Sequence, residues 1–135
     1  MIGLDTNVLV RYMAQDDPKQ SAVATRLIEK ELSPAEPGFI SAVVLAELCW
    51  VLTRLYSASA DELIATIEDL LNTPQLHLDR RDVVIATVQH VRSSKSAKSG
   101  LVDALIVQLA ASEGCLRTVS FDKVAVRSAG MVLLA

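Results

Sequence analysis

Short hydrophobic runs and longer segments with helical periodicity alternate along the chain. The short runs have the length of β-strands and lie at residues 1–4, 39–40, 76–78, 116–120 and 131–134. Between them, apolar residues recur every three or four positions, as on one face of an α-helix. Strands separated by helices are typical of a parallel sheet, because parallel strands need a long crossover connection. The pattern therefore predicts an α/β fold.

Capping residues and helix breakers define the expected helices. Ser59 and Glu62 have the spacing of a capping box, and Asp79 has the position of a cap for a later helix. Gly114 is expected to end a helix in the left-handed conformation. The expected helices cover residues 8–13, 18–32, 42–56, 60–72, 80–91, 101–113 and 122–128.

Length and composition favour one small domain over residues 1–135. The chain has 135 residues, 51% of them hydrophobic, which is enough for a core of its own. No apolar run reaches the roughly 18 residues that cross a bilayer, and no secretory signal is recognisable, so we expect a cytoplasmic protein without a membrane partner. The net charge of −3 argues against nucleic-acid binding by bulk charge, so a polyanion must be held by a local basic patch or through metal.

Four acidic residues lie within or directly after hydrophobic runs: Asp5, Glu47, Asp103 and Asp122. Burying a lone carboxylate costs on the order of several kcal/mol, so these positions call for an explanation. Ligands of parallel α/β proteins bind beyond the carboxyl ends of the strands, and two of the four follow expected strands. A divalent cation shared by all four would explain them together, because Mg²⁺ and Mn²⁺ prefer oxygen ligands.

Three of these residues also have a structural explanation. Asp5 has the position of a helix cap, a role that contributes about 1 kcal/mol. Asp103 would be stabilised by the positive end of its own helix. Asp122 has the position of a cap or turn residue. Helix capping therefore stays open beside metal binding.

Glu47 is harder to explain structurally. It is the only polar side chain in residues 43–52, and a helix that is apolar on all sides is expected to be buried. A glutamate at its centre then needs a cation or a charged partner. The structural alternative to a metal is an ion pair with Arg54 or Arg11.

The motifs that carry these acids resemble those of a known family. Residues 1–12, MIGLDTNVLVRY, resemble the opening of PIN-domain ribonucleases, especially the VapC toxins of bacterial type II toxin–antitoxin pairs. Residues 40–48, ISAVVLAEL, are similar to the second motif of that family, and residues 102–106, VDALI, to the third. Residues 118–123, TVSFDK, resemble the fourth. Each motif alone is weak evidence for the family, but all four occur in order and span nearly the whole chain.

The resemblance implies a fold, an activity and partners. The fold would be a three-layer α/β/α sandwich with a five-stranded parallel sheet, commonly dimeric. The activity would be Mg²⁺- or Mn²⁺-dependent hydrolysis of RNA, held in check by a cognate antitoxin protein. Carried over by position, the acidic quartet Asp5, Glu47, Asp103 and Asp122 would be catalytic and metal-binding, with Thr6, Asn7 and Ser120 as supporting polar groups.

The chain also departs from the family pattern. Leu101 and Val102 replace the aromatic and small residues that often precede the third-motif aspartate, and Ser120 replaces the more frequent threonine. Val124 stands where many members carry a further acid, so the resemblance supports a first metal more strongly than a second. We expect Asp5 and Asp103 to contact the principal metal, and Glu47 and Asp122 to act through water or to hold a weaker ion.

Basic residues near the motifs are candidates for contacts with RNA phosphates: Arg11, Arg92, Lys95, Lys98 and Lys123. The polar run at residues 92–100 is expected to be a flexible loop, and an ordinary solvated linker is its alternative. Aromatic residues make up only 4% of the chain, so wide base-stacking platforms are not expected. Apolar surface on residues 21–32 and 63–71 would suit a second copy or an antitoxin segment.

Other functions remain as alternatives. A catalytically weak PIN-like module that binds RNA or protein is the first, and a small-molecule-binding α/β domain is the second. Nucleotide binding through a glycine-rich loop is disfavoured, because neither Gly-x-Gly-x-x-Gly nor a P-loop pattern occurs. Zinc is disfavoured as well, since the chain has two histidines and no paired cysteines.

Overall fold

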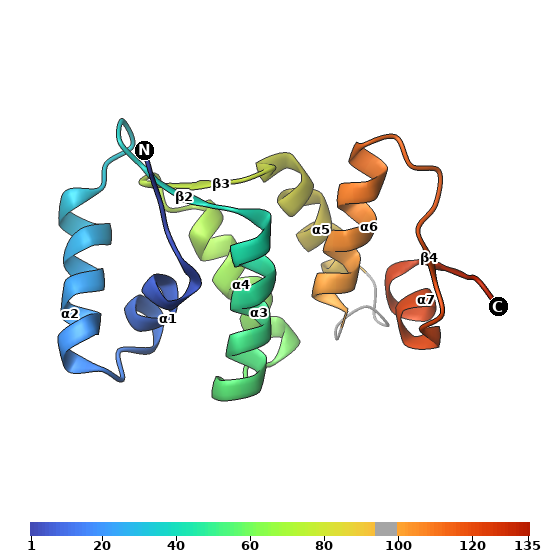
Figure 1. Cartoon of the computed structure of the whole chain (residues 1–135), viewed down its shortest axis with the longest axis horizontal. Helices are drawn as coiled ribbons and strands as arrows, with labels where there is room; N and C mark the ends of the chain where they lie inside the picture. Colours follow the sequence, from blue (N-terminus) through green and yellow to red (C-terminus); the bar gives the residue numbers. More distant parts are fainter. Residues whose placement is uncertain (94–99) are drawn as a thin grey trace. The chain divides into compact units, whose positions relative to one another are not determined.

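The computed structural model describes residues 1–93 and 100–135 and divides into two compact units (Figure 1). The first comprises Met1–Asp79 and the second Arg80–Ala135. We describe each unit by itself. In the part of the chain that the structure describes, no helix is long and apolar enough to span a membrane.

A three-stranded parallel sheet forms the centre of the first unit. It consists of β1 (Ile2–Gly3), β2 (Gly38–Ile40) and β3 (Leu76–Leu78), in the order β1-β2-β3. Gly38 allows close packing, because a Cβ at this position would lie 2.7 Å from Leu4 Cδ1 and would displace that side chain. The three strands run in the same direction, so their carboxyl ends share one edge of the sheet.

Helices pack around this sheet (Figure 1). They are α1 (Thr6–Ala14), α2 (Pro18–Arg26), its π-helical continuation η1 (Leu27–Glu31), α3 (Ala42–Tyr56) and α4 (Ala60–Leu71). Helix α1 packs against both α2 and α3, and α4 packs against β3. The core of the unit includes the buried residues Leu9, Ile28, Ile40, Leu48 and Leu78.

The helix limits of this unit follow the capping chemistry of the sequence. The Ser59 hydroxyl accepts from the Glu62 N–H at 3.2 Å, and the Glu62 carboxylate accepts from the Ser59 N–H at 3.0 Å, so the predicted capping box is confirmed. The Asp79 prediction is wrong: its Oδ2 accepts from the Ala42 N–H, at the start of α3, at 3.4 Å. A residue at the end of a strand can reach the helix that follows the neighbouring strand, which sequence order does not reveal.

The second unit is mainly helical. It contains α5 (Arg81–Ser93), α6 (Leu101–Ser112), β4 (Val119–Ser120), α7 (Lys123–Ala129) and β5 (Val132–Leu133). Helix α6 packs against both α5 and α7, and β4 pairs with β5 in parallel. Gly114 and Gly130 have φ values of 91° and 78°, and the predicted left-handed conformation of Gly114 is therefore confirmed.

The predicted α/β class with parallel strands is confirmed, but the strands do not share one sheet in the structure. The described residues form a three-stranded and a two-stranded parallel sheet. The strand expected at residues 116–120 covers only Val119–Ser120 in the structure. Its partner β5, which follows the turn at Gly130, offers only two residues for pairing. An apolar run fixes where a strand can form, whereas its paired length depends on its neighbour.

Candidate functional site

Asp5 lies at the carboxyl end of β1 and caps α1. Its Oδ1 accepts from the Thr6 N–H at 2.8 Å, which confirms the capping role that the sequence left open. Its second oxygen, Oδ2, has no hydrogen-bond or ion-pair partner among residues 1–93 and 100–135. Capping therefore occupies only one of the two oxygens, and the other can bind a cation.

Two polar neighbours follow Asp5 at the start of α1. Thr6 is 4% exposed, and its buried Oγ1 has no hydrogen-bond partner among the described residues. A buried hydroxyl without a partner is unusual, because leaving one unpaired costs about 1–3 kcal/mol. Asn7 is exposed, and its amide forms no hydrogen bond with any residue that the structure describes. Both groups are thus available to a ligand or to ordered water.

Glu47 differs from its expected environment. Helix α3 is buried on one face only, through Leu45, Leu48, Cys49 and Leu52, whereas Glu47 is exposed. The expectation that this helix is buried on all sides is therefore wrong. Apolar residues such as Val43, which is 78% exposed, also lie on the solvent-facing side, so the helix is more apolar than its burial requires.

The ion-pair explanation of Glu47 is wrong as well. The Arg54 guanidinium lies 4.6 Å from the centre of the Trp50 ring, a cation–π contact. Arg11 donates from Nε to Gln20 Oε1 at 2.7 Å and lies 3.8 Å from Asp16. Within the described chain Glu47 has no hydrogen-bond or ion-pair partner, so its charge is available.

Asp103 and Asp122 interact within the second unit. Asp103 lies in the first turn of α6, and Asp122 precedes α7, which packs against α6. Partial burial raises the pKa of the Asp103 carboxyl above its usual value, and the negative charge of Asp122 raises this pKa further. A cation bound beside Asp103 would favour its ionised form and offset this effect.

Asp122 is held in place by its own backbone contacts. Its Oδ1 accepts from the Val124 N–H at 2.8 Å and from the Ala125 N–H at 3.4 Å, so it caps α7. Its backbone N–H donates to the Ser120 hydroxyl at 2.9 Å. The capping alternative is confirmed here too, and Oδ2 again has no partner in the described part of the chain. The hydroxyl of Ser120 positions the loop that carries this carboxylate.

The donor groups fit a hard divalent cation. Each unit supplies two candidates, Asp5 and Glu47 in the first and Asp103 and Asp122 in the second. All are carboxylates, and Mg²⁺ typically takes one or two carboxylates and keeps several waters. Among the described residues, no group of three or more His, Cys, Asp or Glu side chains could hold a metal ion.

The candidate phosphate contacts are distributed over both units. Arg11 is half-buried and already bonded to Gln20, Arg92 is exposed in the last turn of α5, and Lys123 is exposed at the start of α7. Lys95 and Lys98, together with most of the loop expected at residues 92–100, lie outside the described residues. Lys123 directly follows Asp122, which places a cation in the sequence beside that carboxylate.

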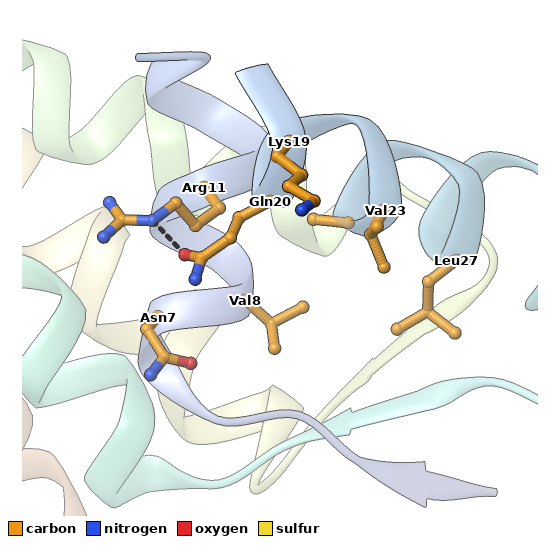
Figure 2. A pocket seen from close by; sticks show the side chains of 8 residues that line it. Asn7, Val8, Arg11, Lys19, Gln20, Val23 and Leu27 are labelled. Carbon is orange, nitrogen blue, oxygen red and sulfur yellow. Dashed lines mark hydrogen bonds between the residues drawn. The ribbon is translucent and has the colours of Figure 1, made fainter. Parts of the chain in front are cut away.

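A cavity between α1 and α2 adds residues that the sequence did not indicate (Figure 2). Lys19 and Gln20 line it from α2, opposite Asn7 and Arg11 from α1. Nothing in the local sequence marks the two α2 residues, because they belong to an ordinary polar first turn. Only the packing of α1 against α2 brings them next to Asn7.

The sequence model of the PIN domain family matches residues 2–130, which covers both units and all four candidate carboxylates. No curated protein sequence matches the chain significantly.

Proposed function

Because the chain belongs to the PIN domain family, whose members are typically metal-dependent nucleases, we propose that it is an endoribonuclease that hydrolyses RNA phosphodiesters. The observation that carries the proposal is the Asp103–Asp122 pair, in which partial burial and then the charge of Asp122 raise the pKa of the Asp103 carboxyl. Four carboxylates at the motif positions of a nuclease family supply oxygen ligands for a divalent cation. The carboxylates are the whole of the catalytic chemistry, so no covalent nucleophile is needed.

We propose that residues 1–135 act as one PIN domain and that the four candidate carboxylates are its metal ligands. Asp5 and Asp103 would bind the principal Mg²⁺ or Mn²⁺ directly, and Glu47 and Asp122 would act through water or hold a weaker ion. When bound, the metal lowers the pKa of a coordinated water and stabilises the leaving oxygen. Ser120 holds the backbone of Asp122, and Thr6 and Asn7 supply polar groups beside Asp5.

The toxin role is part of the same proposal. The ordered motifs resemble those of VapC toxins, which supports a cognate antitoxin and a homodimer as partners. The residues expected to offer apolar surface at 63–71 are instead packed inside the first unit, because Leu63, Ile64, Ile67 and Leu70 are buried. The exposed side chains of Val43, Trp50 and Leu55 on α3 supply apolar surface in their place.

Metal removal tests the proposed activity. We expect the purified protein to cut structured RNA with Mg²⁺ or Mn²⁺, to lose this cleavage in excess EDTA, and to regain it when Mn²⁺ is restored. The measurement is sequencing of the RNA ends. Cleavage that persists in EDTA would contradict a metal-dependent mechanism, and RNA binding without any cleavage would favour the weak binding module.

The substitution Glu47→Gln tests whether Glu47 contributes to RNA cleavage or to the stability of the fold. Since Glu47 is exposed and has no partner among the described residues, its neutralisation should change the free energy of unfolding by less than about 0.5 kcal/mol. Because it acts through water, cleavage should fall by roughly tenfold. Thermal unfolding and initial rates are the two measurements. Glu31→Gln, at an exposed residue 3.5 Å from Arg26, is the matched control and should leave both unchanged.

A further inference from the structure

The first unit contains a cavity of about 430 Å³ between α1 and α2 (Figure 2). Its apolar wall consists of Val8, Val23, Ala24 and Leu27. Hydrogen bonds fix the two helices that form it, including one from the Ser21 hydroxyl to the Arg11 carbonyl at 2.7 Å. The cavity is therefore a preformed feature of the unit, within the size range of small-ligand sites.

The polar lining presents hydrogen-bonding groups with a defined direction. Arg11 Nε–H donates to Gln20 Oε1, which orients the Gln20 amide so that its NH₂ group points away from Arg11 (Figure 2). That NH₂ group and the Asn7 amide have no partners among the described residues. A bound ligand could therefore accept a hydrogen bond from the Gln20 NH₂ group, and could both donate to and accept from the Asn7 amide.

Charge and position indicate the kind of ligand. Lys19 brings a cation to the rim of this cavity on a chain with a net charge of −3, and Arg11 brings a second, which also lies 3.8 Å from Asp16. Asn7 lies two residues after Asp5, at the same end of α1. A ligand that filled the cavity would therefore be anionic, would carry polar edges on an apolar body, and would adjoin the Asp5 carboxylate.

We propose that this cavity binds one unstacked base of the RNA substrate, next to the phosphodiester that is cut. The inference rests on the proposed function for its substrate class. The aliphatic wall contacts the faces of the base, the amides of Gln20 and Asn7 contact its edge, and Lys19 contacts a neighbouring phosphate. Paired amides and rim cations favour a nucleotide over an apolar peptide, which needs neither. The cavity, with Gln20 as its fixed donor, then sets a base preference beside the cut.

Direct binding tests the cavity without any cleavage. The isotope-labelled chain is titrated with each of the four ribonucleoside 5′-monophosphates at millimolar concentration. We expect the side-chain amide signals of Asn7 and Gln20 to shift in NMR spectra, and one base to cause larger shifts than the others. Unchanged signals for all four nucleotides would overturn the proposal. So would shifts caused only by a synthetic helical peptide of leucine and glutamate, since that result assigns the cavity to a protein partner.

Val23→Trp tests the role of the cavity in RNA cleavage. Val23 is 68% exposed, so a larger side chain can cover the opening without entering the core, and unchanged thermal unfolding confirms this. We expect the base preference beside the cut to fall at least about fivefold, while cleavage itself persists. Leu116→Trp, at a 98% exposed residue outside the cavity, is the control and should leave the preference unchanged.

The nucleotide titration and the cleavage assay together distinguish failure of the proposed function from failure of the base site. If the unmodified protein cuts no RNA, the proposed function fails, and the nucleotide titration alone decides about the cavity. If it cuts RNA and Val23→Trp keeps the same base preference, the proposed function stands and the base site is overturned.

Discussion

Asp5→Asn is expected to reduce RNA cleavage by at least about a hundredfold and to leave the fold intact. Groups that only support a metal ligand already contribute about 10–100-fold, so a direct ligand should contribute no less. Asparagine caps helices about as well as aspartate, and its side-chain oxygen can still accept from the Thr6 N–H. The loss of charge at the helix N-terminus should cost at most about 1 kcal/mol.

This substitution therefore separates capping from metal binding. The measurements are cleavage rates with Mn²⁺ and thermal unfolding in EDTA. Asp17→Asn is the matched control: Asp17 caps α2 by accepting from the Gln20 N–H at 3.0 Å, and its substitution should leave cleavage unchanged. If Asp5→Asn cuts RNA as fast as the parent, Asp5 is a cap and nothing more.

Asp103→Asn is expected to reduce RNA cleavage to an extent similar to that of Asp5→Asn. In metal-free protein it is expected to raise the unfolding temperature at pH 7. The pKa of this carboxyl is raised in the folded state by partial burial and then by Asp122, so its ionised form destabilises the folded protein. The cost is absent well below the usual pKa of 3.8, develops as the pH rises toward the folded value, and persists above it.

The pH dependence makes this prediction specific. In EDTA, the gain in unfolding temperature from Asp103→Asn should be present at pH 7 and should vanish in strongly acidic solution. Asp82→Asn is the control, since Asp82 also lies in the first turn of its helix, α5, but is exposed. A variant that loses stability at pH 7 in EDTA would show that Asp103 is a structural residue instead.

Local chemistry made much of the fold predictable. Residues that carry their own signal, such as the Ser59–Glu62 capping box, gave a helix start that the structure confirms. The strand at residues 76–78 was predicted with its full limits, because apolar residues there are bounded by a proline and an aspartate. These features depend on neighbours in sequence, which is why sequence alone identifies them.

Features that depend on distant contacts were not predictable in the same way. The exposed position of Glu47 follows from which face of α3 meets α1, and an apolar sequence on both faces conceals that choice. The division of the strands between two sheets depends on pairing, and Gln20 becomes a cavity residue only through the packing of α2 on α1. Periodicity marks a buried face but does not specify its partner.

Asp5 and Asp122 each cap a helix with one carboxylate oxygen, Oδ1, and this affects how they would bind an ion. Backbone N–H groups, one for Asp5 and two for Asp122, already restrain these side chains, so binding an ion requires less further loss of side-chain entropy. Lengthening either residue to glutamate would sacrifice this preorganisation even though the charge is kept. The hydrogen bonds that cap α1 and α7 thus also orient the two carboxylates before any ion binds.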